Sequence, residues 1–164
     1  MEAKITSHII KGIVVVAILV ALDLFLQKSG LQITTGLQYL PTLILVAGVV
    51  ISCIIFAKQS ATALKFGDVF VHGFKTTAVI ACLMAVYTFF AVKYIYPAPS
   101  AADIAAASKA LQQQGNTMPA EADRMALEGV KKMWVLVVPK VIFVSLVSGL
   151  IGALTGAAIA KKNQ

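Results

Sequence analysis

Long runs of apolar residues alternate with polar connections along this chain of 164 residues. A helix needs about 20 mostly apolar residues to cross the hydrocarbon core of a bilayer. Backbone groups in lipid must find their hydrogen bonds within the segment, so such runs are predicted to be helices rather than isolated strands. The predicted spans are residues 9–26, 40–57, 76–96 and 141–160.

Two further segments complete the predicted architecture. Residues 62–75, called the elbow below, form an amphipathic stretch before the third span. Residues 97–132 form the longest polar connection and are predicted to hold a helix, a turn and a second helix that runs into the fourth span. We therefore expect one all-α, polytopic integral membrane domain over residues 1–164, with four transmembrane helices and a helical extramembrane loop between the third and fourth.

Composition supports lipid as the solvent. Apolar residues make up 59% of the chain and charged residues 13%, whereas a soluble domain is about 45–50% apolar and about 25% charged. The net charge is +7, but the 14 basic residues mostly flank apolar runs. Basic residues in that position orient spans and contact anionic headgroups, so membrane lipids are the expected partners and nucleic acid is not.

The basic residues also predict the orientation of the chain. With the N-terminus inside, seven basic residues fall on each side, but Lys93 and Lys140 lie within predicted helix ends. When these two lysines are not counted, seven basic residues lie on the predicted inner side and five on the outer side. This difference favours both termini in the cytoplasm. Lys11, near the start of the first span, is expected to extend to the headgroups. Because no small-x-small cleavage site follows the first apolar run, we read that run as an uncleaved span rather than a signal peptide.

A family resemblance rests on three parts of the chain. Phe66, Gly67 and Gly73 give a Phe-Gly-x-x-x-x-x-Gly pattern, Tyr94-Ile-Tyr-Pro97 closes the third span, and residues 146–162 are rich in glycine and alanine. This order resembles a small four-span family of Bacteroidota known as domain-of-unknown-function family 4199. The resemblance covers nearly the whole chain. It implies a multi-pass protein of the bacterial inner membrane, and it brings no assigned activity, cofactor or catalytic residue.

Asp23 is the most unusual residue of the predicted spans, because a carboxylate inside a span is costly and marks a candidate functional site. Lys93 and Lys140 also lie near the predicted outer ends of their spans. These three residues form a candidate polar site. The functional hypothesis is a proton or ion relay that uses the carboxylate. The alternative, which we favour, is an interfacial carboxylate that is hydrated or paired with one of the lysines.

The elbow has an aromatic face and a polar face. Phe66, Phe70 and Phe74 recur at four-residue spacing, while Asp68 and His72 lie one turn apart on another face. This pattern predicts a helix in the inner membrane interface that turns into the third span. Asp68 and His72 could share a hydrogen bond or a metal, but we favour a solvated polar face, with a protein docking surface as a weaker alternative.

The fourth span carries small residues at four-residue spacing, which allow two helices to approach closely. We expect packing inside the chain, against the first or second span, and keep self-association or docking to a membrane-protein partner as the alternative. The first row, called the seam below, consists of Ser148, Gly152, Gly156 and Ala160. An adjacent row consists of Ser145, Gly149, Ala153 and Ala157.

Catalytic, metal and cofactor signatures are absent from the sequence. There is no Gly-x-Ser-x-Gly or His-Glu-x-x-His pattern, and no Cys/His cluster of metal-ligand spacing. Cys53 and Cys82 are interpreted as two small buried apolar residues. We therefore expect no catalytic, cofactor-binding or metal-binding residues. The favoured function is a non-enzymatic assembly or accessory membrane component, and the alternative is a small oligomeric transporter or channel component for protons or small cations.

Overall fold

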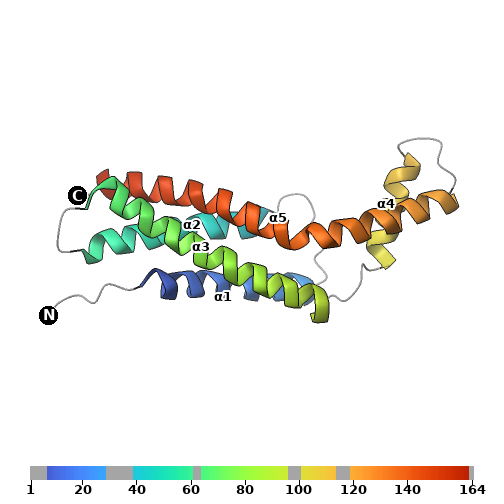
Figure 1. Ribbon diagram of the computed structural model, residues 1–164, viewed down its shortest axis with the longest axis horizontal. Helices are drawn as coiled ribbons and strands as arrows, with labels where there is room; N and C mark the ends of the chain where they lie inside the picture. The colour runs from blue at the N-terminus through green and yellow to red at the C-terminus, as the bar shows by residue number, and fades with distance from the viewer. Residues whose placement is uncertain (1–6, 29–38, 61–63, 96–100, 114–118, 163–164) are drawn as a thin grey trace. The chain divides into compact units, whose positions relative to one another are not determined.

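The computed structural model describes residues 7–28, 39–60, 64–95, 101–113 and 119–162, and every element in this part of the chain is helical. This confirms the predicted all-α fold (Figure 1). The elements are α1 (His8–Lys28), α2 (Leu40–Gln59), α3 (Phe66–Phe90), the π-helical turn η2 (Ala91–Ile95), α4 (Ala101–Gln113) and α5 (Pro119–Lys162).

Four of these helices have the length and composition to cross a membrane. The candidate spans are His8–Leu26, Leu40–Gln59, Phe66–Ile95 and Val135–Ala160. Most of their side chains do not face protein, and large apolar residues such as Phe25, Val135 and Phe143 are strongly exposed. A helix that is apolar on all sides and not covered by protein fits lipid as its surroundings. The prediction of four helices that could span a membrane is confirmed.

The third span begins earlier than the sequence suggested. α3 runs without interruption from Phe66 to Phe90, so the elbow and the predicted span belong to one helix rather than to two helices joined by a turn. Its first turn is capped by Asp68, whose carboxylate accepts a hydrogen bond of 3.0 Å from the Lys65 backbone N–H. A carboxylate in the first turn also interacts favourably with the helix dipole. Parts of the predicted elbow, third span and long connection lie outside the described residues. They are residues 62–63, 96 and 97–100, and 114–118.

The described chain divides into two compact units. The first combines Met1–Met84 with Val141–Gln164, and the second is Ala85–Lys140. Within the second unit, α4 lies against the first part of α5. The Ser108 hydroxyl donates a hydrogen bond to the Asp123 carboxylate, and Ala122 and Ala126 are buried. The predicted helices of the long connection are therefore α4 and the N-terminal part of α5, which starts at Pro119.

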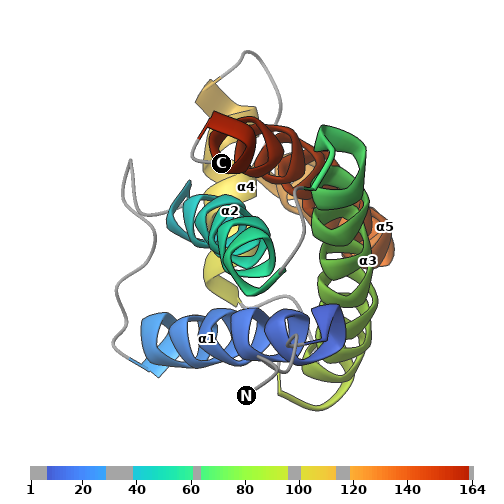
Figure 2. The ribbon, with the colours of Figure 1, turned by 90° about the vertical axis from the view of Figure 1, so that its left-hand side faces the viewer.

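The first unit is a bundle in which α2 contacts three other helices. Seen from its end in Figure 2, α2 lies between α1 and the C-terminal part of α5, with α3 along one side. Glycines permit the close approaches: a methyl group at Gly48 would lie 2.6 Å from Val15 of α1, and one at Gly12 would lie 2.8 Å from Val79 of α3. Contacts without space for a methyl group are typical of membrane helix packing.

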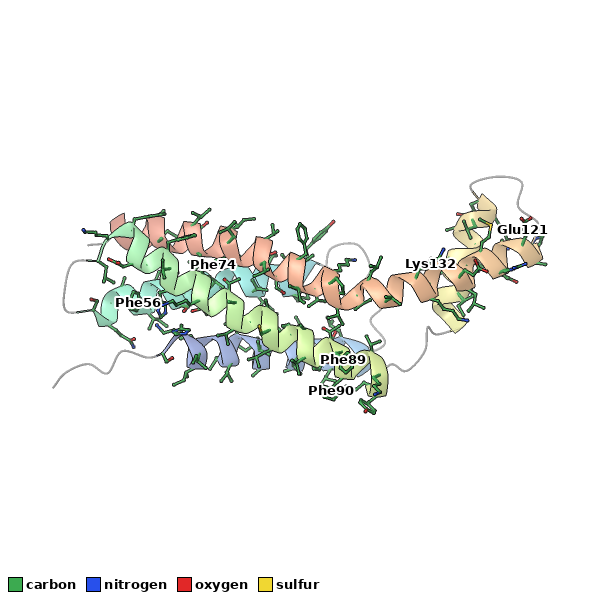
Figure 3. The ribbon with its side chains drawn as sticks, in the orientation of Figure 1. Phe56, Phe74, Phe89, Phe90, Glu121 and Lys132 are labelled. Carbon is green, nitrogen blue, oxygen red and sulfur yellow. The ribbon has the colours of Figure 1, made fainter. Side chains whose placement is uncertain are left out.

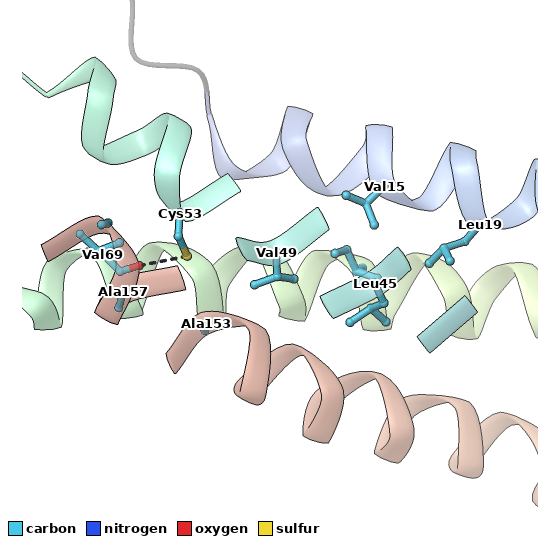
Figure 4. Packing of buried hydrophobic residues seen from close by; sticks show 10 residues of the cluster. Val15, Leu19, Leu45, Val49, Cys53, Val69, Ala153 and Ala157 are labelled. Atoms are coloured by element: carbon cyan, nitrogen blue, oxygen red, sulfur yellow. Dashed lines mark hydrogen bonds between the residues drawn. The ribbon is translucent and has the colours of Figure 1, made fainter. Parts of the chain in front are cut away.

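The hydrophobic cluster buried in this bundle is made mostly of small or branched residues. Figure 4 shows Val15, Leu19, Leu45 and Val49 between the helices, and Cys53 directed at the Val69 carbonyl, 3.7 Å from its sulfur. α1 and α3 run in the same direction, while α2 and α5 run the opposite way (Figure 1). One end of the bundle therefore holds the start of α1 and α3 and the end of α2 and α5. We call it the basic end, after Lys11, Lys58, Lys65 and Lys75.

Candidate functional site

Four polar side chains meet inside the bundle near the basic end. They are Lys11 of α1, Ser52 of α2, and His72 and Thr76 of α3, and we call them the polar cluster. All four are buried, with exposed fractions of 8%, 2%, 8% and 0%. Polar and ionisable side chains buried within spans are costly and mark functional sites by default. The cluster is thus the strongest candidate site in the described part of the chain.

Lys11 supplies the charge of the cluster. Its ammonium Nζ lies 3.3 Å from the Ser52 carbonyl oxygen and 3.3 Å from His72 Nε2. The same Nζ lies 5.7 Å from the centre of the Phe56 ring, within the range of a cation–π interaction. All three partners are uncharged acceptors, since His72 Nε2 accepts a hydrogen bond only in the neutral ring. No carboxylate is among the partners of Lys11 in the described residues.

A chain of hydroxyl groups continues from the lysine. The Thr76 hydroxyl donates to the His72 carbonyl at 3.0 Å, so its oxygen is left to accept. Ser52 Oγ lies 3.2 Å from Thr76 Oγ1, and the proton of this bond therefore belongs to Ser52. Every buried side-chain polar atom among the described residues has a partner.

Aromatic rings enclose His72 on two sides. Phe56 of α2 stacks on the imidazole with ring centres 4.0 Å apart and planes 4° apart, and Phe56 is labelled in Figure 3. His8 of α1 approaches the edge of the same ring, with centres 6.1 Å apart. These contacts fix the ring so that Nε2 is directed at Lys11. The cluster therefore holds one positive charge, that of Lys11, next to the rings of His72 and Phe56 near the basic end.

Two predictions about this region were wrong. His72 was assigned to a solvated polar face, but only 8% of it is exposed, because the face opposite Phe66 and Phe74 packs against α1 and α2. Lys11 was expected to extend to the headgroups, but its ammonium lies inside the bundle. A signal was present in the sequence: the four-residue spacing of His72 and Thr76 places two polar residues on one face of a span.

The remaining elbow residues have simpler surroundings. Phe66, Phe70 and Phe74 stack along one face of α3, with successive ring centres 6.3 and 6.2 Å apart. Phe74, labelled in Figure 3, is 44% exposed. Asp68 caps the helix start rather than meeting His72. Phe66 and Phe74 therefore point outward and Phe70 is partly buried against the core, while His72 points into the bundle.

The candidate polar site of Asp23, Lys93 and Lys140 is divided between the two units. Asp23 is half-buried on α1 in the first unit. Lys93 and Lys140 belong to the second unit and are exposed, and Lys93 Nζ lies 5.4 Å from the centre of the Tyr94 ring. A joint role for the three residues stays a prediction.

The seam packs inside the chain. Ser148, Gly152, Gly156 and Ala160 are all buried. A methyl group on Gly152 would lie 3.0 Å from the Val46 carbonyl oxygen, and one on Gly156 would lie 2.7 Å from Cys53 Cβ, both on α2. The adjacent row faces α3, where Gly149 meets Thr77. The expected packing against the second span is observed, and the third span is an additional partner.

Groups that could hold a metal are absent from the described residues, where no three His, Cys, Asp or Glu side chains come together. Cys53 is buried, as expected, whereas Cys82 is exposed on the outer side of α3.

Comparison with known proteins gives one match. A family model described as a protein of unknown function, DUF4199, matches residues 9–162. No curated protein and no solved structure matches the chain. The matched residues cover the four candidate spans, apart from His8 at the start of the first. The family is the one that the Phe66–Gly73 pattern resembles. This chain belongs to the DUF4199 family.

Proposed function

We propose that this protein is a non-enzymatic accessory component of the bacterial inner membrane, and that it binds an anionic group at the basic end through Lys11. The observation that carries the proposal is a buried ammonium whose described partners are all uncharged. Removing a charge from water costs several kcal/mol, and neutral acceptors return only part of that cost. A bound anion would complete the site, as phosphate and carboxylate groups do elsewhere with lysine.

The geometry argues against an enzyme at the polar cluster. Ser52 Oγ and His72 Nε2 are 3.5 Å apart, at the limit of a hydrogen bond. The Ser52 proton is directed at Thr76, and His72 Nε2 accepts from Lys11, so the ring has no free base position for activating the serine. Ser52 also lies inside α2, where backbone N–H groups are used by the helix and cannot form an oxyanion hole. These features support a binding role over nucleophilic catalysis.

The geometry also favours binding over conduction. Beyond the polar cluster, Val15, Leu19, Leu45, Val49 and Ile80 are buried in the bundle, together with the hydroxyl residues Thr77, Ser145 and Ser148. Among the described residues no charged side chain other than Lys11 is buried there, which supports binding at one end over conduction through the bundle. The alternative of an oligomeric transporter or channel component, with Asp23 as its relay, stays a separate prediction. Flux in proteoliposomes that Asp23→Asn abolishes would favour it.

A thermal-shift experiment tests the anion site. The full chain in an uncharged detergent is melted in sodium phosphate and in sodium chloride of equal ionic strength, with helicity followed by circular dichroism. Phosphate is expected to raise the Tm of the wild type and of Lys65→Met, and to leave Lys11→Met unchanged. Lys65 is the matched control because it is exposed at the same end. At 100 times its Kd, a ligand adds about 2.7 kcal/mol of stability.

Stability in chloride gives a second readout. Replacing buried charged groups by apolar residues of similar volume is often neutral or stabilising when no charged partner is left behind. We therefore expect Lys11→Met to be at least as stable as the wild type in chloride, which is typical of a residue kept for function. A phosphate shift that persists in Lys11→Met, or no shift in the wild type, would refute the proposal.

A further inference from the structure

A groove on the outside of the bundle lies between α1 and α3, close to the basic end. It is a shallow, open groove of about 360 Å³, lined by apolar side chains of both helices: Ile9, Ile13, Ala78, Val79, Cys82 and Leu83. Its volume falls near the lower end of the roughly 300–1,000 Å³ of small-molecule sites. Ile9 and Ile13 are about half exposed, so the groove opens toward the surroundings of the bundle, which for a spanning helix is lipid.

Basic residues stand at the end of this groove nearest the basic end. Lys75 precedes Ala78 by three residues on α3, and His8 directly precedes Ile9 on α1. Residues three or four apart share a helix face, so Lys75 lies one turn above the groove on the same side of α3. The His8 ring approaches the edge of His72, with ring centres 6.1 Å apart, and His72 lies one turn before Lys75 on α3. The Lys75 charge and the His8 ring therefore lie at the end of the groove nearest the basic end, which we call the mouth of the groove.

We propose that this groove holds an acyl chain of an anionic phospholipid, whose phosphate group is bound at the mouth by His8 and Lys75. This site lies on the outside of the bundle and is separate from the proposed anion site at Lys11, whose ammonium lies inside the bundle. The charge at the mouth selects the headgroup, and the apolar walls select a chain rather than a soluble anion. No carboxylate among the described residues lies at the mouth to oppose an anion, since Asp68 is turned back to the Lys65 backbone.

The groove and the mouth contribute in different ways. Lipid tails are as apolar as the groove walls, so an acyl chain gains shape contacts there but no hydrophobic free energy. Selectivity between lipids must therefore come from the charge at the mouth. A basic side chain near anionic lipid corresponds to about a five-fold preference. The groove sets where the lipid lies, and the mouth sets which lipid is bound.

Native mass spectrometry tests both contributions. The full chain in an uncharged detergent is titrated with phosphatidylglycerol or phosphatidylcholine of identical acyl chains. We expect phosphatidylglycerol to bind preferentially, and Lys75→Gln to lower that preference about five-fold, whereas Lys65→Gln leaves it unchanged. Ala78→Phe fills the groove and is expected to weaken phosphatidylglycerol binding at least ten-fold. Ala158→Phe, on an exposed position of α5, is the matched control.

The outcomes separate this inference from the proposed function. If Ala78→Phe lowers helicity, Cys82→Phe replaces it, because Cys82 is exposed and also lines the groove. Equal binding of the two lipids by the wild type, or unchanged phosphatidylglycerol binding in the groove-filling variant, would overturn the lipid site. Neither result affects the increase in Tm in phosphate, which is expected to depend on Lys11. A phosphate shift that survives in Lys11→Met would overturn the proposed function, whichever lipid result is obtained.

Discussion

Replacing Gly156 with alanine tests the close approach of α5 and α2. The new methyl carbon would lie 2.7 Å from Cys53 Cβ and 3.1 Å from Val50 Cα. Optimal separations between carbon atoms are about 3.5–4.0 Å. Both neighbours are fixed to the backbone of α2, so no rotamer change relieves the overlap, and the two helices must move apart.

The magnitude follows from two opposing terms. Overpacking a well-packed interior costs about 1–3 kcal/mol. Replacing glycine by alanine in a helix returns up to about 1 kcal/mol. Gly67→Ala isolates the second term, because a methyl group there meets nothing within 4 Å. The difference in the free energy of unfolding between Gly156→Ala and Gly67→Ala is therefore expected to be about 1–3 kcal/mol.

Unfolding by sodium dodecyl sulfate, followed by circular dichroism in mixed micelles, measures this difference, and chemical cross-linking of the same samples reports association. We expect Gly156→Ala to unfold at a lower detergent fraction than Gly67→Ala, with the same cross-linking pattern as the wild type. Equal stability of the two variants would refute the packing argument. Equal stability together with loss of cross-linked oligomers would place the seam between chains.

Two other variants address hydrogen bonds at separate places. Thr76→Val removes the hydroxyl that accepts from Ser52, and we expect the stability to fall by about 1–2 kcal/mol, since a buried donor loses its partner. Thr77→Val is its control, because the Thr77 hydroxyl donates to the Gly73 carbonyl of its own helix, and an equal loss in both variants would contradict the proposed network. Ser108→Ala removes the hydrogen bond to Asp123 between α4 and α5. Hydrogen exchange should then speed up in α4 and stay unchanged in α2; unchanged α4 protection would show that this bond does not hold the helices together.

The absence of a described counter-charge at Lys11 changes how the +7 chain is understood. Basic residues of membrane proteins are usually interpreted as orientation signals, and most of those here flank the spans in that way. Lys11 differs because its ammonium is held by a carbonyl oxygen, an imidazole and an aromatic face inside the bundle. The proposed binding role rests on the cost of holding this charge, and Lys11→Met measures that cost.

Sequence patterns alone were enough to predict the helical fold, the four apolar helices and the family. These features depend on local composition: runs of apolar residues long enough to cross a bilayer form helices whichever neighbours they have. The small residues of α5 likewise predicted a close contact with another helix, because glycine and alanine at four-residue spacing form a flat strip on one helix face. The sequence did not reveal whether that strip faces the same chain or another.

Only the tertiary structure decided which polar residues meet. Lys11, Ser52 and His72 lie on three helices and are separated by 41 and 20 residues, so no local pattern connects them. Whether a lysine near a helix end extends to the headgroups or turns inward depends on the acceptors that neighbouring helices present. The same reason explains why the groove between α1 and α3 was not foreseen. It is a product of two parallel helices, and neither helix contains it alone.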